Sequence, residues 1–213
     1  TFGGRAEFQV ANCLAAAAAS RALGCTSSQV ALKLTTFVDT VDNPGRSSLY
    51  SLGNGYVMVD YGHNPAAFRS TGALVNHWSG PLIGIVGAPG DRDDAIIYEV
   101  ATAAAAVYHH VLIREDADRR GRSPGEVPAM MRDTILRVNP AARVEIVTDE
   151  LEALRALLPQ VIEGSLVVLY YEHLEPVAAI LAAAGGKPAD GSSLFSQSPV
   201  PTPPVAPVPM GAK

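Results

Sequence analysis

Short apolar segments alternate with longer amphipathic ones along most of this chain, and the alternation predicts its main elements. Strand-length apolar segments lie at 48–52, 56–60, 81–86, 110–113, 144–147 and 165–170. Segments with helical periodicity lie at 65–77, 93–108, 125–138, 149–162 and 174–184. Apolar strands that alternate with helices are typical of βαβ units. We therefore predict an α/β fold in which a Rossmann-like, mostly parallel sheet has helices on both faces.

The first two strands should form a hairpin, since Gly53-Asn54-Gly55 between them is a strong turn sequence. We expect one antiparallel hairpin strand at an edge of the sheet. Right-handed crossovers between the parallel strands place every strand-to-helix loop at one edge, which we call the rim. Ligands of open α/β sheets bind at this carboxyl edge.

Two helices should precede the sheet, at about 10–23 and 27–37, and a turn-rich hinge follows them at 41–46. Two such helices bury little by themselves, so they should pack on something absent from this chain or on the domain that follows. We predict that residues 1–42 are the helical end of a preceding domain and that residues 43–187 form the main domain. The chain begins at Thr1 without a methionine, and we expect it to be a fragment or a gene product that lacks its N-terminal portion.

The segment 188–213 is rich in proline, serine, alanine and glycine. Such a composition buries too little apolar surface to order itself, so we predict a disordered tail. A polyproline ligand for a partner is the alternative.

Composition narrows the classes of function. The formal net charge of −5 at pH 7 argues against a nucleic-acid partner. No apolar run reaches the roughly 20 residues that span a membrane. Cys13 and Cys25 have no second cysteine pair and no histidine at ligand spacing, so we predict reduced core thiols, with a disulfide or redox role as the alternative. No signal-peptide pattern is present, and we predict a cytoplasmic protein without a membrane partner.

Polar side chains follow each predicted parallel strand and should meet at the rim. One strand ends on Asp60, and Tyr61, His63 and Asn64 follow before Pro65 opens a helix. A carboxylate at a strand end can accept both hydroxyls of a ribose, and an imidazole ring can lie on a purine. The alternative is an ordinary helix N-cap with a surface histidine.

Two further rim loops carry charge. Gly87-Ala88-Pro89-Gly90-Asp91 could cradle a phosphate through its backbone N–H groups, or could form a tight turn in which Asp91 caps the helix. The loop 114–122 holds four arginines and three acids. Such a mixed loop suits a zwitterionic amino acid, and arginine is an attractive candidate. A solvated run of charges is the alternative.

Several of these motifs resemble Mur-type ATP-dependent amide ligases over about residues 4–187. Asn43-Pro44-Gly45-Arg46 resembles the hinge between the central and C-terminal domains of that family, and residues 8–16 resemble the last helical part of its central ATPase domain. The resemblance implies that Arg46 reaches an ATP phosphate and that Asn12 faces the adenine.

The same resemblance assigns the ribose to Asp60 and places Tyr61 and His63 near the nucleotide. We assign Asn64, in the same turn, to this ATP site as well. No catalytic residue and no metal ligand is predicted in this chain, because the family's phosphate-binding loop and magnesium-binding acids belong to its central domain.

Three motifs are typical of the branch of this family that makes cyanophycin. They are Gly90-Asp91-Arg92-Asp93-Asp94, Glu115-Asp116-x-Asp118-x-Arg120-Gly121-Arg122 and Tyr171-Glu172-x-Leu174-Glu175-Pro176. The Asp-Asn-Pro-Arg loop of peptidoglycan ligases is not found in the sequence. We therefore assign contacts with the amino-acid substrate to residues of these motifs: Asp91, Arg92, Glu115, Asp116, Asp118, Arg120, Arg122 and Glu172.

The resemblance implies a reaction in which ATP, with magnesium, phosphorylates an aspartate side-chain carboxylate and the amine of arginine attacks the acyl phosphate. The implied partners are ATP, arginine and an aspartate-containing peptide or polymer, and a homo-oligomer is expected for the full-length enzyme. The 213-residue chain should be inactive alone. Two alternatives are a non-catalytic nucleotide- or partner-binding module, and a ligase for a dipeptide or another amino acid.

Overall fold

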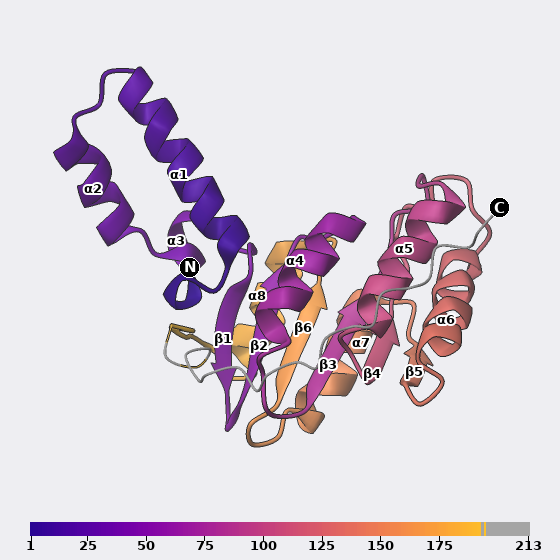
Figure 1. The fold of residues 1–213 in the computed structure, drawn as a ribbon. Coiled ribbons are helices and arrows are strands. Elements are labelled where there is room, and N and C mark those ends of the chain that lie inside the picture. Colours follow the sequence, from indigo (N-terminus) through magenta and orange to yellow (C-terminus); the bar gives the residue numbers. More distant parts are fainter. Residues whose placement is uncertain (193, 195–213) are drawn as a thin grey trace, which may run out of the picture.

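The computed structural model describes residues 1–192 and 194, and its centre is a seven-stranded sheet (Figure 1). The strands lie in the order β5-β4-β3-β6-β2-β1-β7. Their bounds are β1 (Ser48–Leu52), β2 (Gly55–Asp60), β3 (Leu82–Val86), β4 (His110–Ile113), β5 (Arg143–Ile146), β6 (Leu166–Tyr170) and β7 (Lys187–Pro188). Strands β2 to β6 pair in parallel, whereas β1 is antiparallel to both of its neighbours. The predicted α/β fold with a mostly parallel sheet is confirmed.

Helices cover both faces of this sheet, as predicted. The helices on one face are α4 (Pro65–Val75), α5 (Asp94–Ala105) and α6 (Glu126–Val138), and those on the other are α7 (Glu150–Leu157) and α8 (Leu174–Ala183). Successive side chains of a strand point to opposite faces, so each strand supplies both cores. Met58 of β2 belongs to the buried cluster of α4 to α6, and Val57 and Val59 belong to that of α7 and α8.

The central strand β6 is buried along its whole length, because it has a strand on each side and helices above and below. Val168 joins one core, and Val167 and Leu169 join the other. Burying an aliphatic side chain of this size contributes about 1.5–3 kcal/mol. The two cores therefore hold the rim loops on a rigid base.

Some element ends differ from those expected. Helix α7 ends at Leu157 rather than near 162, and a short 3-10 turn, Leu158–Gln160, follows it. Pro159 explains the difference, since it has no N–H to continue the helical ladder. A short helix, α3 (Asp39–Asp42), occupies part of the predicted hinge.

The strand β7 changes the boundary of the predicted tail. Pro188, expected to begin the disordered segment, pairs with Tyr50, and the Ala189 amide donates to the Leu49 carbonyl at 2.9 Å. The sheet therefore continues past 187, and the hairpin strand β1 is not outermost. The pattern could not predict so short a strand. The rest of the predicted tail, 193 and 195–213, lies outside the described residues.

Helices α1 (Glu7–Ala22) and α2 (Ser27–Thr36) project away from the sheet (Figure 1). Neither helix contains a buried residue, and Leu23 just after α1 is 87% exposed. Cys13 is half-buried and Cys25 is exposed, and both are free, so they are not the core thiols that were expected. The segment before α1 differs, because Phe2 and Ala6 are buried in the core under α4 to α6.

No helix in the described part of the chain is long and apolar enough to cross a membrane.

Candidate functional site

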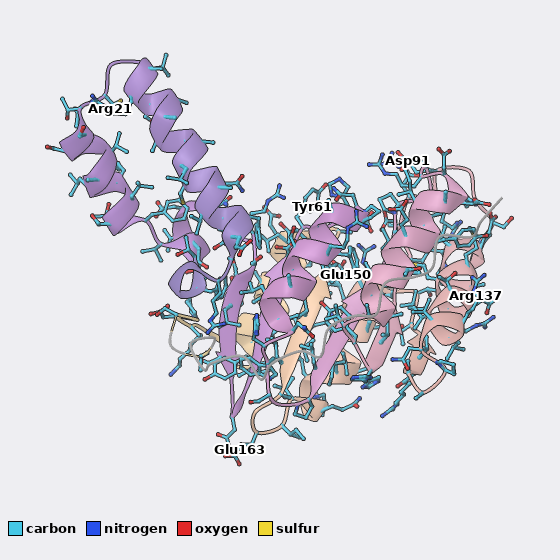
Figure 2. All side chains as sticks on the ribbon, in the orientation of Figure 1. Arg21, Tyr61, Asp91, Arg137, Glu150 and Glu163 are labelled. Atoms are coloured by element: carbon cyan, nitrogen blue, oxygen red, sulfur yellow. The ribbon has the colours of Figure 1, made fainter. Side chains whose placement is uncertain are left out.

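The side chains assigned to ligands follow the carboxyl ends of β2, β3, β4 and β6, which lie at one edge of the sheet because these strands are parallel. Figure 2 shows Tyr61 and Asp91 at this rim and Glu163 at the opposite edge. The structure thus brings the two assigned groups, after β2 and around the charged loops, to the same edge. Asn12 and Arg46 are exceptions, since Asn12 is exposed on the projecting helix α1 and Arg46 lies just before the antiparallel strand β1.

Asp60 is the last residue of β2 and is only 7% exposed. Its Oδ2 accepts a hydrogen bond from the Ser47 hydroxyl at 2.7 Å. Within the described residues, no hydrogen bond reaches its Oδ1, which lies near Gly62. Asp60 therefore keeps one oxygen available for a ligand. Sequence reasoning missed Ser47, although it directly follows the hinge arginine.

A cationic and aromatic cluster stands beside Asp60. The Arg46 guanidinium lies 4.9 Å from the centre of the Tyr61 ring, and Tyr61 in turn contacts the rings of His63 and Tyr171 at 5.2 and 5.5 Å. Tyr61 and Arg46 are exposed. Such a group offers a flat apolar surface and a positive charge side by side, which suits a ligand with a ring and an anionic group.

The hinge packs closely against this cluster. Gly45 has a φ of +77°, and a Cβ at this position would collide with the Tyr171 hydroxyl. Burial raises the pKa of Tyr171, while the nearby Arg46 charge acts in the opposite direction. Gln9 of α1 also reaches the hinge, where its Nε2 donates to the Arg46 carbonyl at 3.4 Å.

Asn64 has a local partner. It is the N-cap of α4, and its Oδ1 accepts a hydrogen bond from the Ala67 amide at 2.9 Å. The helix cap in this turn is therefore Asn64 rather than Asp60. His63 is half-buried, and its Nδ1 lies 3.1 Å from the Tyr61 carbonyl oxygen.

Arg114 opens the charged loop and is almost fully buried, at 4% exposed. Its guanidinium pairs with Asp116 and, at 3.1 Å, with Glu150 of α7, and its Nε also donates to the Tyr170 carbonyl at 3.0 Å. The charge run is therefore not uniformly solvated, because its first part is built into the protein. Glu150 lies at the start of the helical segment expected at 149–162, and it was not assigned to the site from the sequence.

Arg122 closes the loop and fastens it to its neighbour. Its side chain donates to the carbonyls of Gly90 and Arg92 and pairs with Asp94 and Glu126. The two loops also approach closely, since a Cβ on Gly90 would collide with the carbonyl of Arg119. The loops 87–94 and 114–122 therefore form one packed unit.

Asp91 does not cap α5, whose N-cap is Asp93. Instead Asp91 pairs with Arg120 at 3.2 Å, and Arg120 also pairs with Asp118 at 2.9 Å. This outer chain of charges is solvated, with 72% of the Asp118 side chain exposed.

The remaining assigned residues differ in whether their polar atoms already have partners in the protein. Glu115 accepts a hydrogen bond from the Gly125 amide, and Glu172 accepts one from the Ala117 amide, at 2.8 and 3.0 Å. The Nε of Arg92 is buried without a hydrogen-bond partner among the described residues. No group of three or more histidine, cysteine, aspartate or glutamate residues in the described part of the chain could hold a metal ion.

This fold and rim define a ligase domain. The Mur ligase, glutamate ligase domain family matches residues 45–170, and the chain belongs to this family. Cyanophycin synthetase from Synechocystis sp. is 39% identical over 184 residues, which are 86% of this chain and 21% of that protein. The chain is a homologue of cyanophycin synthetases and spans about a fifth of the length of these relatives.

Two further likenesses concern a ligase of another name. The UDP-N-acetylmuramoyl-L-alanyl-D-glutamate--2,6-diaminopimelate ligase of Caulobacter vibrioides is 31% identical over 163 residues, covering 76% of this chain and 32% of that protein. A solved structure of a ligase with that name has a TM-score of 0.57 at 23% identity and covers 84% of this chain and 38% of that one. It shares the fold.

Proposed function

We propose that this chain is the C-terminal part of an ATP-dependent ligase that joins the amine of arginine to an aspartate side-chain carboxylate. The supporting observation is the 39% identity with a cyanophycin synthetase over 184 residues. A match of that length in a chain of 213 residues includes both charged rim loops. These loops carry the motifs that differ from those of the peptidoglycan ligases.

In the proposed reaction, the carboxylate attacks the γ-phosphorus of ATP, which gives an acyl phosphate and ADP. The arginine amine then attacks the acyl carbon, phosphate leaves, and the amine loses a proton. The contribution of this chain would be to bind and orient the ATP and the amino acid. Arg46 would offer its charge to a phosphate, Asp60 would accept the ribose hydroxyls through its open oxygen, and Tyr61 would lie near the base.

For the amino acid, the structure suggests a division within the assigned loop. Arg114 and Arg122 are bound to several protein groups and would hold the loop's shape. Asp118 and Arg120 are more exposed and would be available to the charged ends of an incoming arginine. Carboxylates bind a guanidinium through charge-assisted hydrogen bonds, which makes Asp118 the best candidate for contact with the substrate side chain.

The helices α1 and α2 would belong to a preceding domain that also supplies the phosphate loop and the magnesium ligands. Their apolar side chains are exposed here, which fits a partner surface outside this chain. The sequence contains no Gly-Lys-Ser/Thr phosphate loop of its own. The proposed domain boundary near residue 42 also agrees with a family match that begins at residue 45.

The test uses the full-length protein that carries this chain, with an aspartate-containing peptide and magnesium ATP. We expect phosphate release and a mass gain of one arginine residue only when arginine is present. Lysine, glutamate and diaminopimelate each replace arginine in parallel reactions. Equal or better turnover with one of these would show that arginine is not the preferred substrate. No ligation with arginine or with any of the three would contradict the proposal.

A further inference from the structure

One buried carboxylate joins separate segments of the rim. Glu150 begins α7, and 9% of its side chain is exposed. Its Oε2 lies 3.1 Å from the Nε of Arg114 and accepts a hydrogen bond from the Glu172 amide at 2.6 Å. Its Oε1 lies 3.5 Å from the His173 amide nitrogen. The loop after β4 and the turn after β6 therefore meet at this side chain.

The two segments also contact each other directly, without Glu150. Arg114 pairs with Asp116, and the next residue, Ala117, donates its amide to the Glu172 carboxylate at 3.0 Å. The contacts thus form a closed ring through Glu150, Arg114, the loop at 116–117 and Glu172. A closed ring restricts each member more than a single contact does, because no segment can move without breaking two bonds.

Stability alone explains this ring poorly. Removing two charges from water costs free energy that their attraction only partly repays, so buried ion pairs are weak evidence of net stabilisation. Burial raises the pKa of the Glu150 carboxyl, although the Arg114 charge acts in the opposite direction. A carboxylate kept in this place at such a cost is better explained by the geometry that it imposes.

We propose that Glu150 is a positioning residue that joins the segment 114–117 to the segment 171–173 and so sets the shape of the amino-acid loop. The joining follows from the contacts alone, whereas the effect on the amino acid rests on the proposed function. The neighbouring Glu152 offers a matched control, because it lies on the same helix with an exposed side chain.

The first test measures amide hydrogen exchange in the 213-residue chain. In Glu150→Ala we expect exchange at the Ala117 and Glu172 amides to become at least about ten-fold faster, with Leu112 and Val168 in the strands unchanged. Glu152→Ala should match the unaltered chain. If Glu150→Ala does not fold, Glu150→Gln keeps the size of the side chain and removes its charge; it should speed exchange at the Ala117 amide, and unchanged exchange there would count against the joining in the same way. Unchanged exchange at Ala117 and Glu172 would overturn the joining.

The second test compares Michaelis constants in the full-length ligase. Glu150→Ala should raise KM for arginine at least about ten-fold and change KM for ATP less than about two-fold. Equal changes in both constants, or a change in neither, would overturn the positioning role even if exchange at Ala117 is faster. If the unaltered ligase does not join arginine at all, the proposed function fails, and the exchange result then stands as a structural finding without the amino-acid assignment.

Discussion

Asp60 has a structural partner and an open oxygen, and substitutions can separate the two. We expect Asp60→Ala in the full-length ligase to raise KM for ATP, with about 1–3 kcal/mol of binding lost if a buried charged hydrogen bond to the ribose disappears. Ser47→Ala is the matched control, since it removes only the 2.7 Å hydrogen bond to Oδ2. It should lower stability and leave KM for ATP unchanged. The same rise of KM in both variants, or in neither, would contradict the assignment.

The exposed part of the charged loop should recognise the substrate, and the buried part should not. Asp118→Asn should raise KM for arginine by about 10- to 100-fold, because a charge-assisted hydrogen bond contributes about 1.5–3 kcal/mol. It should change the melting temperature little, since this side chain is exposed. Asp116→Asn weakens a buried pair with Arg114 and should lower the melting temperature instead. The prediction fails if Asp118→Asn leaves KM for arginine unchanged or raises KM for ATP by the same factor.

The raised pKa of Glu150 gives stability a definite pH dependence. The charged and titratable groups around it are Arg114, Glu172 and Tyr171, and Arg114 also pairs with Asp116. Because burial raises its pKa in the folded state, the folded protein binds this proton more tightly than the unfolded chain does. The resulting stabilisation is complete below the ordinary glutamate range and is lost as pH rises through the raised folded value.

The difference in unfolding free energy between the unaltered chain and Glu150→Gln should therefore shift towards the unaltered chain as pH falls from about 7 to about 4. Urea unfolding of both proteins at several pH values measures this difference. A shift towards the variant over the same range would show that the Arg114 charge, rather than burial, dominates the environment of Glu150.

At the scale of elements, α1 and α2 differ from the helices that cover the sheet. Leu23, at the end of α1, is 87% exposed, whereas Leu74 in α4 is 1% exposed. In the 213-residue chain, Leu23→Ala should change the unfolding free energy by less than about 0.5 kcal/mol. Leu74→Ala should cost about 2–5 kcal/mol, because it leaves a cavity in a packed core.

The proposed preceding domain leads to a second prediction for Leu23→Ala and Leu74→Ala. In the full-length ligase, Leu23→Ala should become destabilising, because its side chain would then be covered. Chemical unfolding of both variants in both proteins makes the comparison. A small effect of Leu23→Ala in the full-length ligase would show that no partner covers the end of α1.

At the scale of the whole molecule, we propose that the described residues supply only one side of a ligand site. Arg46, Asp60 and Tyr61 are our proposed contacts for a nucleotide, but the sequence has no phosphate-binding lysine loop. We expect the 213-residue chain to bind ATP more weakly than the micromolar range and to show no ligation. Calorimetry with magnesium ATP tests this expectation. Micromolar affinity of the chain alone would favour the alternative of an independent nucleotide-binding module.

The local pattern was enough to predict the succession of strands and helices along the chain and the position of the rim. Periods of two and of 3.6 residues arise from neighbouring positions, and parallel strands necessarily bring their carboxyl ends to one edge. The pattern failed where a single feature overrides it, as at Pro159 and in the two-residue strand β7. The motifs also proposed Arg46 and Asp60 as ligand contacts, because these stand at fixed places relative to the hinge and the end of β2, and these roles stay predictions.

Only the tertiary structure decided which charges of the rim are paired. Arg114 and Arg120 look alike in sequence, yet the first is buried against Glu150 and the second is half exposed between two aspartates. Each arginine also has a nearby aspartate, Asp116 or Asp118, but its other partner, Glu150 or Asp91, comes from a segment about thirty residues away, and that meeting depends on how strands, helices and turns pack. Ser47 at Asp60 and Glu150 at Arg114 were missed for the same reason, since burial and distance are properties of the folded chain.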